Sequence, residues 1–283
     1  MKLALLLSAV LFLHSILYSQ VYTEKDSEIC ASVFKYAVVK NLKNKSTGDI
    51  IAYVGKSLLG TEYKAATLER EGEEALVINL KGLDCTTFLE NAIVFARLIK
   101  RDSTTFKNYL RELAFIRYRG GELNGYPSRL HYFSDWIFDN IHKKVVYDVT
   151  KELGGIPIKF SVNFMSEHPV LYMHLKESPA FIPVIKSQEN SISLRTYFYI
   201  PKDNVTLIEK DLRDGDIIAF TTSVKGLDIG HVGIAVREND GRIHILHAPQ
   251  PGTKVHITKE PLTEYIMNVK KHSGIIVLRA EEL

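Results

Sequence analysis

Residues 213–248 read RDGDIIAFTTSVKGLDIGHVGIAVRENDGRIHILHA and contain the clearest strand pattern of the chain. Short apolar runs alternate there with turn signals such as RDG (213–215) and NDG (239–241). This alternation predicts strands joined by tight turns. The strands predicted in this stretch and after it span residues 216–220, 231–236, 242–248, 254–258 and 274–279. We therefore expect the last third of the chain to form an antiparallel sheet.

The segments that precede this stretch have the spacing of helices. The strongest pattern covers residues 85–100, where apolar residues recur three and four positions apart and Asp84 is a natural N-cap. Further helices are predicted over residues 24–42, 47–59, 104–115 and 132–143. Helices first and a sheet afterwards predict an α+β domain with the helices packed on one side of the antiparallel sheet.

The composition is that of a single globular domain. Of the 283 residues, 46% are hydrophobic and 24% are charged, which suits one large core. We expect one domain over residues 21–283. The net charge of +3 comes without a dense basic block, so nucleic acid is not an expected partner.

The first twenty residues, MKLALLLSAVLFLHSILYSQ, have the features of a secretory signal. A permanent anchor needs about 18 or more unbroken apolar residues, but His14, Ser15 and Ser19 interrupt this run. We therefore expect a cleaved signal peptide over residues 1–20 and a mature protein with no stable membrane anchor. The expected localisation is secretion across the inner membrane into the periplasm. An uncleaved anchor is the alternative.

The chain contains two cysteines, Cys30 and Cys85, and we expect it to meet an oxidising compartment. A structural disulfide between them is one interpretation. Cys30, however, lies on the apolar face of a predicted helix, which is typical of a buried thiol. Cys85 instead follows the predicted N-cap Asp84, and this position makes it the candidate nucleophile.

A cysteine nucleophile requires a thiolate and a base. A helix N-terminus favours the thiolate through its unpaired N–H groups, while the carboxylate of Asp84 opposes it. His231, at the start of a predicted strand and between glycines, is the candidate base. His247 follows sixteen residues later, where the hairpin brings it near His231. The predicted catalytic residues are Cys85, His231 and His247, with His247 orienting His231.

Two other interpretations of these residues stay open. The chain has ten histidines, and a histidine on a strand is more often structural than catalytic. A zinc site made of one cysteine and two histidines is chemically allowed, but no fourth ligand and no metal-type spacing accompany these three. We therefore predict neither a metal nor an organic cofactor.

Three separated segments stand out in this order: LLGTEYKAATLE (58–69), LDCTTFLE (83–90), and the series LRDGDIIAF, GHVGIAV and HILHAP within residues 212–249. Together they resemble the NlpC-type, papain-like superfamily of bacterial cell-wall cysteine hydrolases. The resemblance implies a papain-like core, with Tyr63 beside the nucleophile. One departure is Thr86, because serine is frequent at that position in the superfamily.

A fourth segment, IRYRGGELNGYPSRLHYFSDWI (116–137), is similar to a narrower family formerly described only as a domain of unknown function. This similarity implies an N-acetylmuramoyl-L-alanine amidase that acts on soluble muropeptides, notably fragments with an anhydro sugar. The segment belongs to a long insertion, about residues 101–205, between the nucleophile and the histidine. We expect this insertion to set the specificity.

The same segment contains candidate substrate contacts. Arginine presents a fork of donors that matches a carboxylate, so Arg117, Arg119 and Arg129 are candidates for binding the acidic stem peptide. We favour Arg129, His131 and Tyr132, because they follow a loop with glycine and proline of the kind that forms pocket walls. The alternative is that the aromatic residues belong to the core and the arginines to a solvated face.

The predicted function is hydrolysis of the amide between the muramoyl lactyl group and L-Ala of peptidoglycan fragments, through a thioester on Cys85. The backbone N–H of Cys85 is expected to stabilise the oxyanion, with Tyr63 and Asp84 among the groups around it. The closest alternative is an endopeptidase that cuts between γ-D-Glu and diaminopimelate. An alternative of another class is a cell-wall binding protein with an inactive site.

Overall fold

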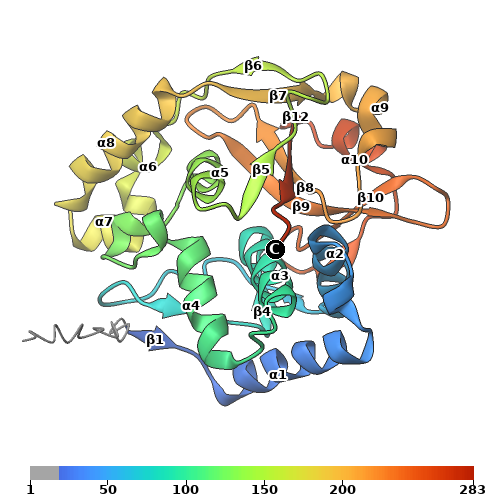
Figure 1. Ribbon diagram of the computed structural model, residues 1–283. Coiled ribbons are helices and arrows are strands. Elements are labelled where there is room, and N and C mark those ends of the chain that lie inside the picture. The colour runs from blue at the N-terminus through green and yellow to red at the C-terminus, as the bar shows by residue number, and fades with distance from the viewer. Residues whose placement is uncertain (1–18) are drawn as a thin grey trace, which may run out of the picture.

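The computed structural model describes residues 19–283 (Figure 1). Residues 1–18, and with them nearly all of the predicted signal peptide, lie outside the described part. The described chain begins with strand β1 (Gln20–Val21), which pairs in parallel with β3 (Leu76–Val77). Among the helices of the described part, none has the length and hydropathy of a membrane span.

The first half of the described chain is mainly helical, as predicted. Its α-helices are α1 (Glu24–Val39), α2 (Thr47–Ser57), α3 (Cys85–Lys100), α4 (Phe106–Arg117) and α5 (Phe133–His142). Each of them overlaps a helix predicted from the spacing of apolar residues. The side chains of Ser46 and Thr105 accept backbone N–H bonds at the starts of α2 and α4, and these bonds satisfy donors that helices otherwise leave unpaired.

The main sheet has eight strands in the described part of the chain, in the order β11-β10-β9-β8-β12-β7-β6, with β5 also beside β12. Every pairing in it is antiparallel, which confirms the predicted sheet. The five predicted strands correspond to β8 (Ile217–Thr222), β9 (Ile229–Arg237), β10 (Ile243–His247), β11 (His256–Ile257) and β12 (His272–Ala280).

The predicted insertion contributes to this sheet instead of standing apart from it. Its strands are β5 (Val146–Asp148), β6 (Ile156–Ile158) and β7 (Tyr197–Pro201). Strands β5 and β7 pair with β12, and β6 pairs with β7. The insertion also supplies α6 (Phe164–Glu167), α7 (Met173–Glu177) and α8 (Phe181–Leu194). These helices lie together beyond α5 (Figure 1).

The sheet is buried on both faces. Along β8, Ile217 and Ala219 face a large core that includes α2 and α3, while Ile218 and Phe220 face a smaller core. Helices α9 (Val205–Ile208) and α10 (Leu262–Asn268) contribute to this smaller core. The prediction that helices lie on one side of the sheet was therefore wrong, although the α+β class is confirmed. Helices this short have too little periodicity to be recognised in the sequence.

Helix α3 lies near the middle of the molecule, between α2 and α4 (Figure 1). Its side chains from Thr87 to Ile99 are buried. Burial of one large apolar side chain stabilises a fold by about 1.5–3 kcal/mol, so α3 is held firmly. Its first residue, Cys85, is thereby fixed relative to the sheet.

Candidate active site

Cys85 is the first residue of α3, as predicted. The Asp84 carboxylate accepts bonds from the backbone N–H and the hydroxyl of Thr87, both at 2.8 Å. The Asp84 N–H in turn donates to the Thr87 hydroxyl at 2.9 Å. These reciprocal bonds form an N-cap, so the extended backbone before Asp84 ends there and the helix begins at Cys85. The thiol is therefore presented by the helix N-terminus.

His231 and His247 lie side by side on β9 and β10, as the predicted hairpin requires. His231 Nε2 is 2.8 Å from His247 Nδ1, and the two rings are inclined at 71°. A Cβ on Gly233 would come within 2.5 Å of Ile245 Cγ2 and 3.3 Å of His247 Cβ. Glycine at this position thus lets the two strands approach closely enough for the histidines to bond.

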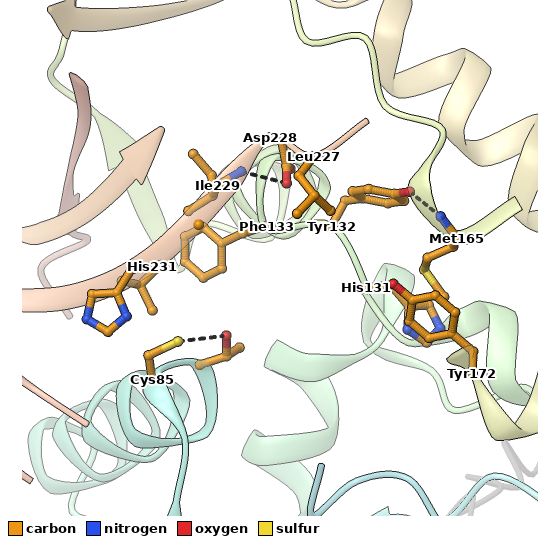
Figure 2. Close-up of a pocket in the computed structure, with 13 residues that line it drawn as sticks. Cys85, His131, Tyr132, Phe133, Met165, Tyr172, Leu227, Asp228, Ile229 and His231 are labelled. Atoms are coloured by element: carbon orange, nitrogen blue, oxygen red, sulfur yellow. Dashed lines mark hydrogen bonds between the residues drawn. The ribbon is translucent and has the colours of Figure 1, made fainter. Parts of the chain in front are cut away.

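Cys85 and His231 line one hollow of about 280 Å³. Figure 2 shows both side chains at one end of it, with Met165, Tyr172 and His131 at the other. The complete lining is Cys85, Thr86, His131, Tyr132, Phe133, Met165, Tyr172, Leu227, Asp228, Ile229, Gly230, His231 and Val232. The Cys85 Sγ lies 4.0 Å from the Thr86 hydroxyl. No hydrogen bond joins this sulfur to His231.

Burial keeps the Cys85 thiol and the His231 imidazole uncharged. Burial and the Asp84 carboxylate raise the pKa of the Cys85 thiol to about 11, against hydrogen bonds from Val232 and Thr86 that lower it. Burial, with His272 nearby, lowers the pKa of His231 to about 3. At neutral pH the site therefore holds a thiol and a neutral imidazole, and the opposing effect predicted for Asp84 is confirmed.

Tyr63 lies on a short strand next to the one that leads into Cys85. Strand β2 (Glu62–Tyr63) pairs in parallel with β4 (Gly82–Leu83), which leads directly into Cys85. Burial raises the pKa of the Tyr63 hydroxyl, and the charges of Cys85 and Asp84 raise it further. At neutral pH the Tyr63 hydroxyl thus keeps its proton and can donate a hydrogen bond.

His131 and Tyr132 line the hollow, but their polar atoms already serve the fold. The Tyr132 hydroxyl donates to Glu189 at 2.7 Å and accepts from the Met165 N–H at 3.0 Å. His131 Nε2 lies 3.0 Å from the Tyr126 carbonyl. Tyr132 therefore ties α5 to α6 and α8, and it presents its ring rather than its hydroxyl to a ligand.

Arg129 does not line this hollow, contrary to its predicted contact with substrate. Its side chain is 5% exposed, and its guanidinium donates to the carboxylate of Glu69 and to the Leu68 carbonyl. Arg129 Nε also lies 3.5 Å from Glu74. Arg117 and Arg119 are likewise paired, with Glu90 and Asp135. These guanidinium groups neutralise carboxylates of the protein itself.

Asp228 is a residue of the site that the sequence analysis missed. It is 2% exposed and lines the hollow. Its two carboxylate oxygens accept from the backbone N–H groups of Ser134 and Ile229, both at 2.7 Å. Asp228 thus caps the start of α5 from another segment. The one feature of the sequence that could have indicated Asp228 as a site residue is its position three residues before His231.

The alternatives raised for the cysteines receive no support from the structure. Cys30 and Cys85 are both free thiols, so the proposed disulfide between them is absent. Cys30 is buried in the core as predicted. Within residues 19–283, no group of three or more His, Cys, Asp or Glu side chains is arranged to hold a metal ion.

The fold and the site define an α+β protein in which a cysteine at a helix start shares a hollow with a hydrogen-bonded histidine pair. A family model described as AmiA-like, N-acetylmuramoyl-L-alanine amidase-like, matches residues 53–275. The chain belongs to this family. Membership indicates a hydrolase that acts on peptidoglycan-derived material.

Solved structures agree with this assignment. An N-acetylmuramoyl-L-alanine amidase from Bacteroides uniformis ATCC 8492 is 35% identical with a TM-score of 0.77, covering 83% of this chain and 99% of its own. A Bacteroides fragilis structure that carries the name of a candidate xylanase is 40% identical with a TM-score of 0.74, covering 80% and 98%. A Legionella pneumophila protein, 19% identical with a TM-score of 0.66 over 90% and 95%, shares the fold alone. No curated protein matches the chain.

Proposed function

We propose that the chain is a cysteine-dependent N-acetylmuramoyl-L-alanine amidase with a papain-like core of the NlpC type. Cys85 is the nucleophile, His231 the general base and acid, and His247 the residue that orients His231. One observation carries the proposal: a thiol at a helix start lines the same hollow as a histidine whose second ring nitrogen is bonded to another histidine at 2.8 Å.

The reaction proceeds by acylation and hydrolysis. As the sulfur attacks the lactyl carbonyl, its proton passes to Nδ1 of His231, which makes no hydrogen bond within residues 19–283. The carbonyl oxygen becomes an oxyanion, and we assign its stabilisation to the backbone N–H of Cys85 and the Tyr63 hydroxyl. His231 then protonates the L-Ala nitrogen, and the peptide leaves. Water, deprotonated by His231, hydrolyses the thioester and restores the thiol.

The substrates are soluble muropeptides, with anhydro-sugar fragments as the preferred class. The lining of the hollow beside Cys85 includes Tyr132, Phe133 and Tyr172, whose rings suit the faces of a sugar. The proposed export signal over residues 1–20 places the mature enzyme in the periplasm, where wall turnover releases such fragments.

A glycosidase activity, as the name of the Bacteroides fragilis structure implies for that protein, fits this hollow poorly. Glycoside hydrolysis uses two carboxylates that face each other about 5–10 Å apart across the bond. Asp228 is the one carboxylate in the lining of the hollow, and both of its oxygens accept backbone hydrogen bonds. An acid and base pair for a glycosidic bond is therefore lacking there.

The test is digestion of anhydro-muramoyl-L-Ala-γ-D-Glu-diaminopimelate by the exported protein, with mass spectrometry of the products. A free peptide that begins at L-Ala supports the amidase. A sugar that still carries L-Ala and D-Glu would show the endopeptidase alternative to be correct. Binding without any product would favour the inactive binding protein. The Cys85→Ala variant, with its fold checked by circular dichroism, should form no product.

A further inference from the structure

The hollow that holds Cys85 and His231 contains no cation. None of its lining residues is lysine or arginine, and burial together with Arg129 lowers the pKa of His131 well below its usual value. A ligand carboxylate that is desolvated in this hollow would have no cationic side chain in the lining to pair with, and burial of an unpaired charge costs free energy. An uncharged ligand with apolar faces, such as a sugar, is the chemistry that this hollow accommodates.

A second hollow, of about 320 Å³, adjoins the nucleophile by way of Tyr63. It shares no lining residue with the first hollow. Its lining includes Tyr63, Lys64, Lys81 and Gly82, which are residues of β2, β4 and their flanks. The chain that leads into Cys85 therefore lies between a hollow lined by no lysine or arginine and one that is lined by two lysines.

The two lysines are not neutralised within the described part of the chain. Lys64 and Lys81 are exposed, and neither has a carboxylate of residues 19–283 within 4.0 Å. The acidic groups of the same hollow are engaged elsewhere. Glu62 pairs with Lys254 at 2.8 Å, and Asp26 accepts from Thr23 and from the Leu80 N–H.

Lys64 packs against the strand that leads into Cys85, and Lys81 is the residue before that strand. Lys64 packs over Gly82, because a Cβ built on Gly82 would lie 2.8 Å from the Lys64 Cβ. Gly82 precedes Cys85 by three extended residues, a separation of about 10 Å. A peptide that leaves the scissile amide in extended form covers about 3.5 Å per residue. Its second and third residues, which bear the carboxylates of the stem, therefore reach the lysines.

We propose that Lys64 and Lys81 bind the stem-peptide carboxylates and thereby fix the direction of the substrate. The muramoyl sugar occupies the hollow of Tyr132, Phe133 and Tyr172, and the anionic peptide lies over Tyr63 towards the lysines. This inference rests on the proposed amidase function. It assigns to two exposed lysines the role that the sequence suggested for Arg129.

The test compares muramoyl-L-Ala-D-Glu with muramoyl-L-Ala-D-glutamic acid diamide, in which neutral amides replace both carboxylates. Wild type should prefer the acidic substrate about fivefold in kcat/KM, the size of one or two exposed charge contacts. The preference should weaken as salt rises from 50 to 500 mM. The double variant Lys64→Gln, Lys81→Gln should lose it. Lys107→Gln, Lys186→Gln, which changes two other exposed lysines, should keep it.

A second variant tests the direction. Tyr172→Ala should lower kcat/KM for both substrates while the preference for the acidic stem persists. If Tyr172→Ala removes the preference and the Lys64, Lys81 variant retains it, the peptide lies in the first hollow and the inference is overturned. If wild type shows no preference, the inference is overturned while the amidase function stands. If wild type hydrolyses neither substrate at the L-Ala bond, the proposed function fails as well.

Discussion

His231 Nε2 lies 2.8 Å from His247 Nδ1, across the end of the β9–β10 pairing. This contact fixes the ring of His231, and in the proposed mechanism its Nδ1 receives the proton of the thiol. His247 Nε2 is buried and has no hydrogen-bond partner among residues 19–283. His247 therefore has a single strong polar contact, and its side chain is tied to the state of His231.

His247→Ala should lower kcat about a hundredfold with a small change in KM, because a buried imidazole without its orienting partner loses its tautomer and its position. His247→Asn, whose carbonyl oxygen can accept the same bond, should retain more activity. Steady-state kinetics on one muropeptide would measure both variants. Equal losses in the two variants would contradict an orienting role and indicate that His247 only fills space.

Thiol reactivity offers a second measurement. Since the pKa of Cys85 is raised to about 11, alkylation of the free enzyme should be slow at pH 7 and should accelerate up to about pH 11. Asp84→Asn removes one cause of this shift and keeps a good N-cap. This variant should therefore react faster at pH 8. Labelling should occur at Cys85 and spare the buried Cys30, and equal rates in both proteins would contradict the role of Asp84.

Three buried histidines should make the fold sensitive to acid. Burial lowers the pKa of His231 to about 3, of His247 to about 2 and of His272 to about 4. In the unfolded chain these histidines have their usual pKa of about 6.5. Below that pH the unfolded chain therefore binds more protons than the folded chain does. Their contribution to the free energy of unfolding is complete above pH 6.5 and is lost as the pH falls towards 4.

His272→Leu removes one of these groups and leaves His231 and His247 in the chain. Between pH 6.5 and 5.0, wild type should lose about 2 kcal/mol more stability than the variant. Buried carboxylates with a raised pKa, such as Asp228, act with the opposite sign in both proteins and cancel in the comparison. Urea titrations of both proteins at the two pH values would measure the free energy of unfolding. An equal loss of stability in wild type and variant would contradict the prediction.

The local features of the site were predictable from the sequence. Asp84 and Cys85 mark a helix start by residue type alone, and the NDG turn fixes the register that brings His231 to His247. In each case the partners lie close in the chain or are linked by one hairpin. Short-range physical chemistry therefore predicted the helix start at Cys85 and the contact between His231 and His247.

The far wall of the hollow could not be predicted, because its partners are distant in sequence and lie on irregular segments. Asp228 bonds to Ser134, 94 residues away, and no periodic pattern relates them. Arg129 meets Glu69, 60 residues away. Without that partner, a buried arginine resembles a substrate-binding one. The residue types show that Asp228 and Arg129 carry ionisable groups. Only the tertiary contacts show that these groups are already paired within the protein.

Arg129 should contribute to stability rather than to substrate binding. Arg129→Met leaves Glu69 and Glu74 without their cation, and loss of one member of a buried pair costs about 3–5 kcal/mol. The triple variant Arg129→Met, Glu69→Gln, Glu74→Gln should recover part of this loss. Urea unfolding would measure both. A normal stability together with a tenfold higher KM would instead restore Arg129 as a substrate contact.

Asp228 should hold the wall of the hollow through α5. Asp228→Ala deprives the Ser134 and Ile229 N–H groups of their acceptor, at a cost of about 2 kcal/mol. Amide exchange at Ser134 should accelerate, and kcat/KM should fall because Tyr132 and Phe133 move with the helix start. Asp228→Asn retains a carbonyl acceptor for one of the two bonds and should show smaller changes. If Ser134 stays protected in Asp228→Ala, the cap on α5 is not what positions this wall.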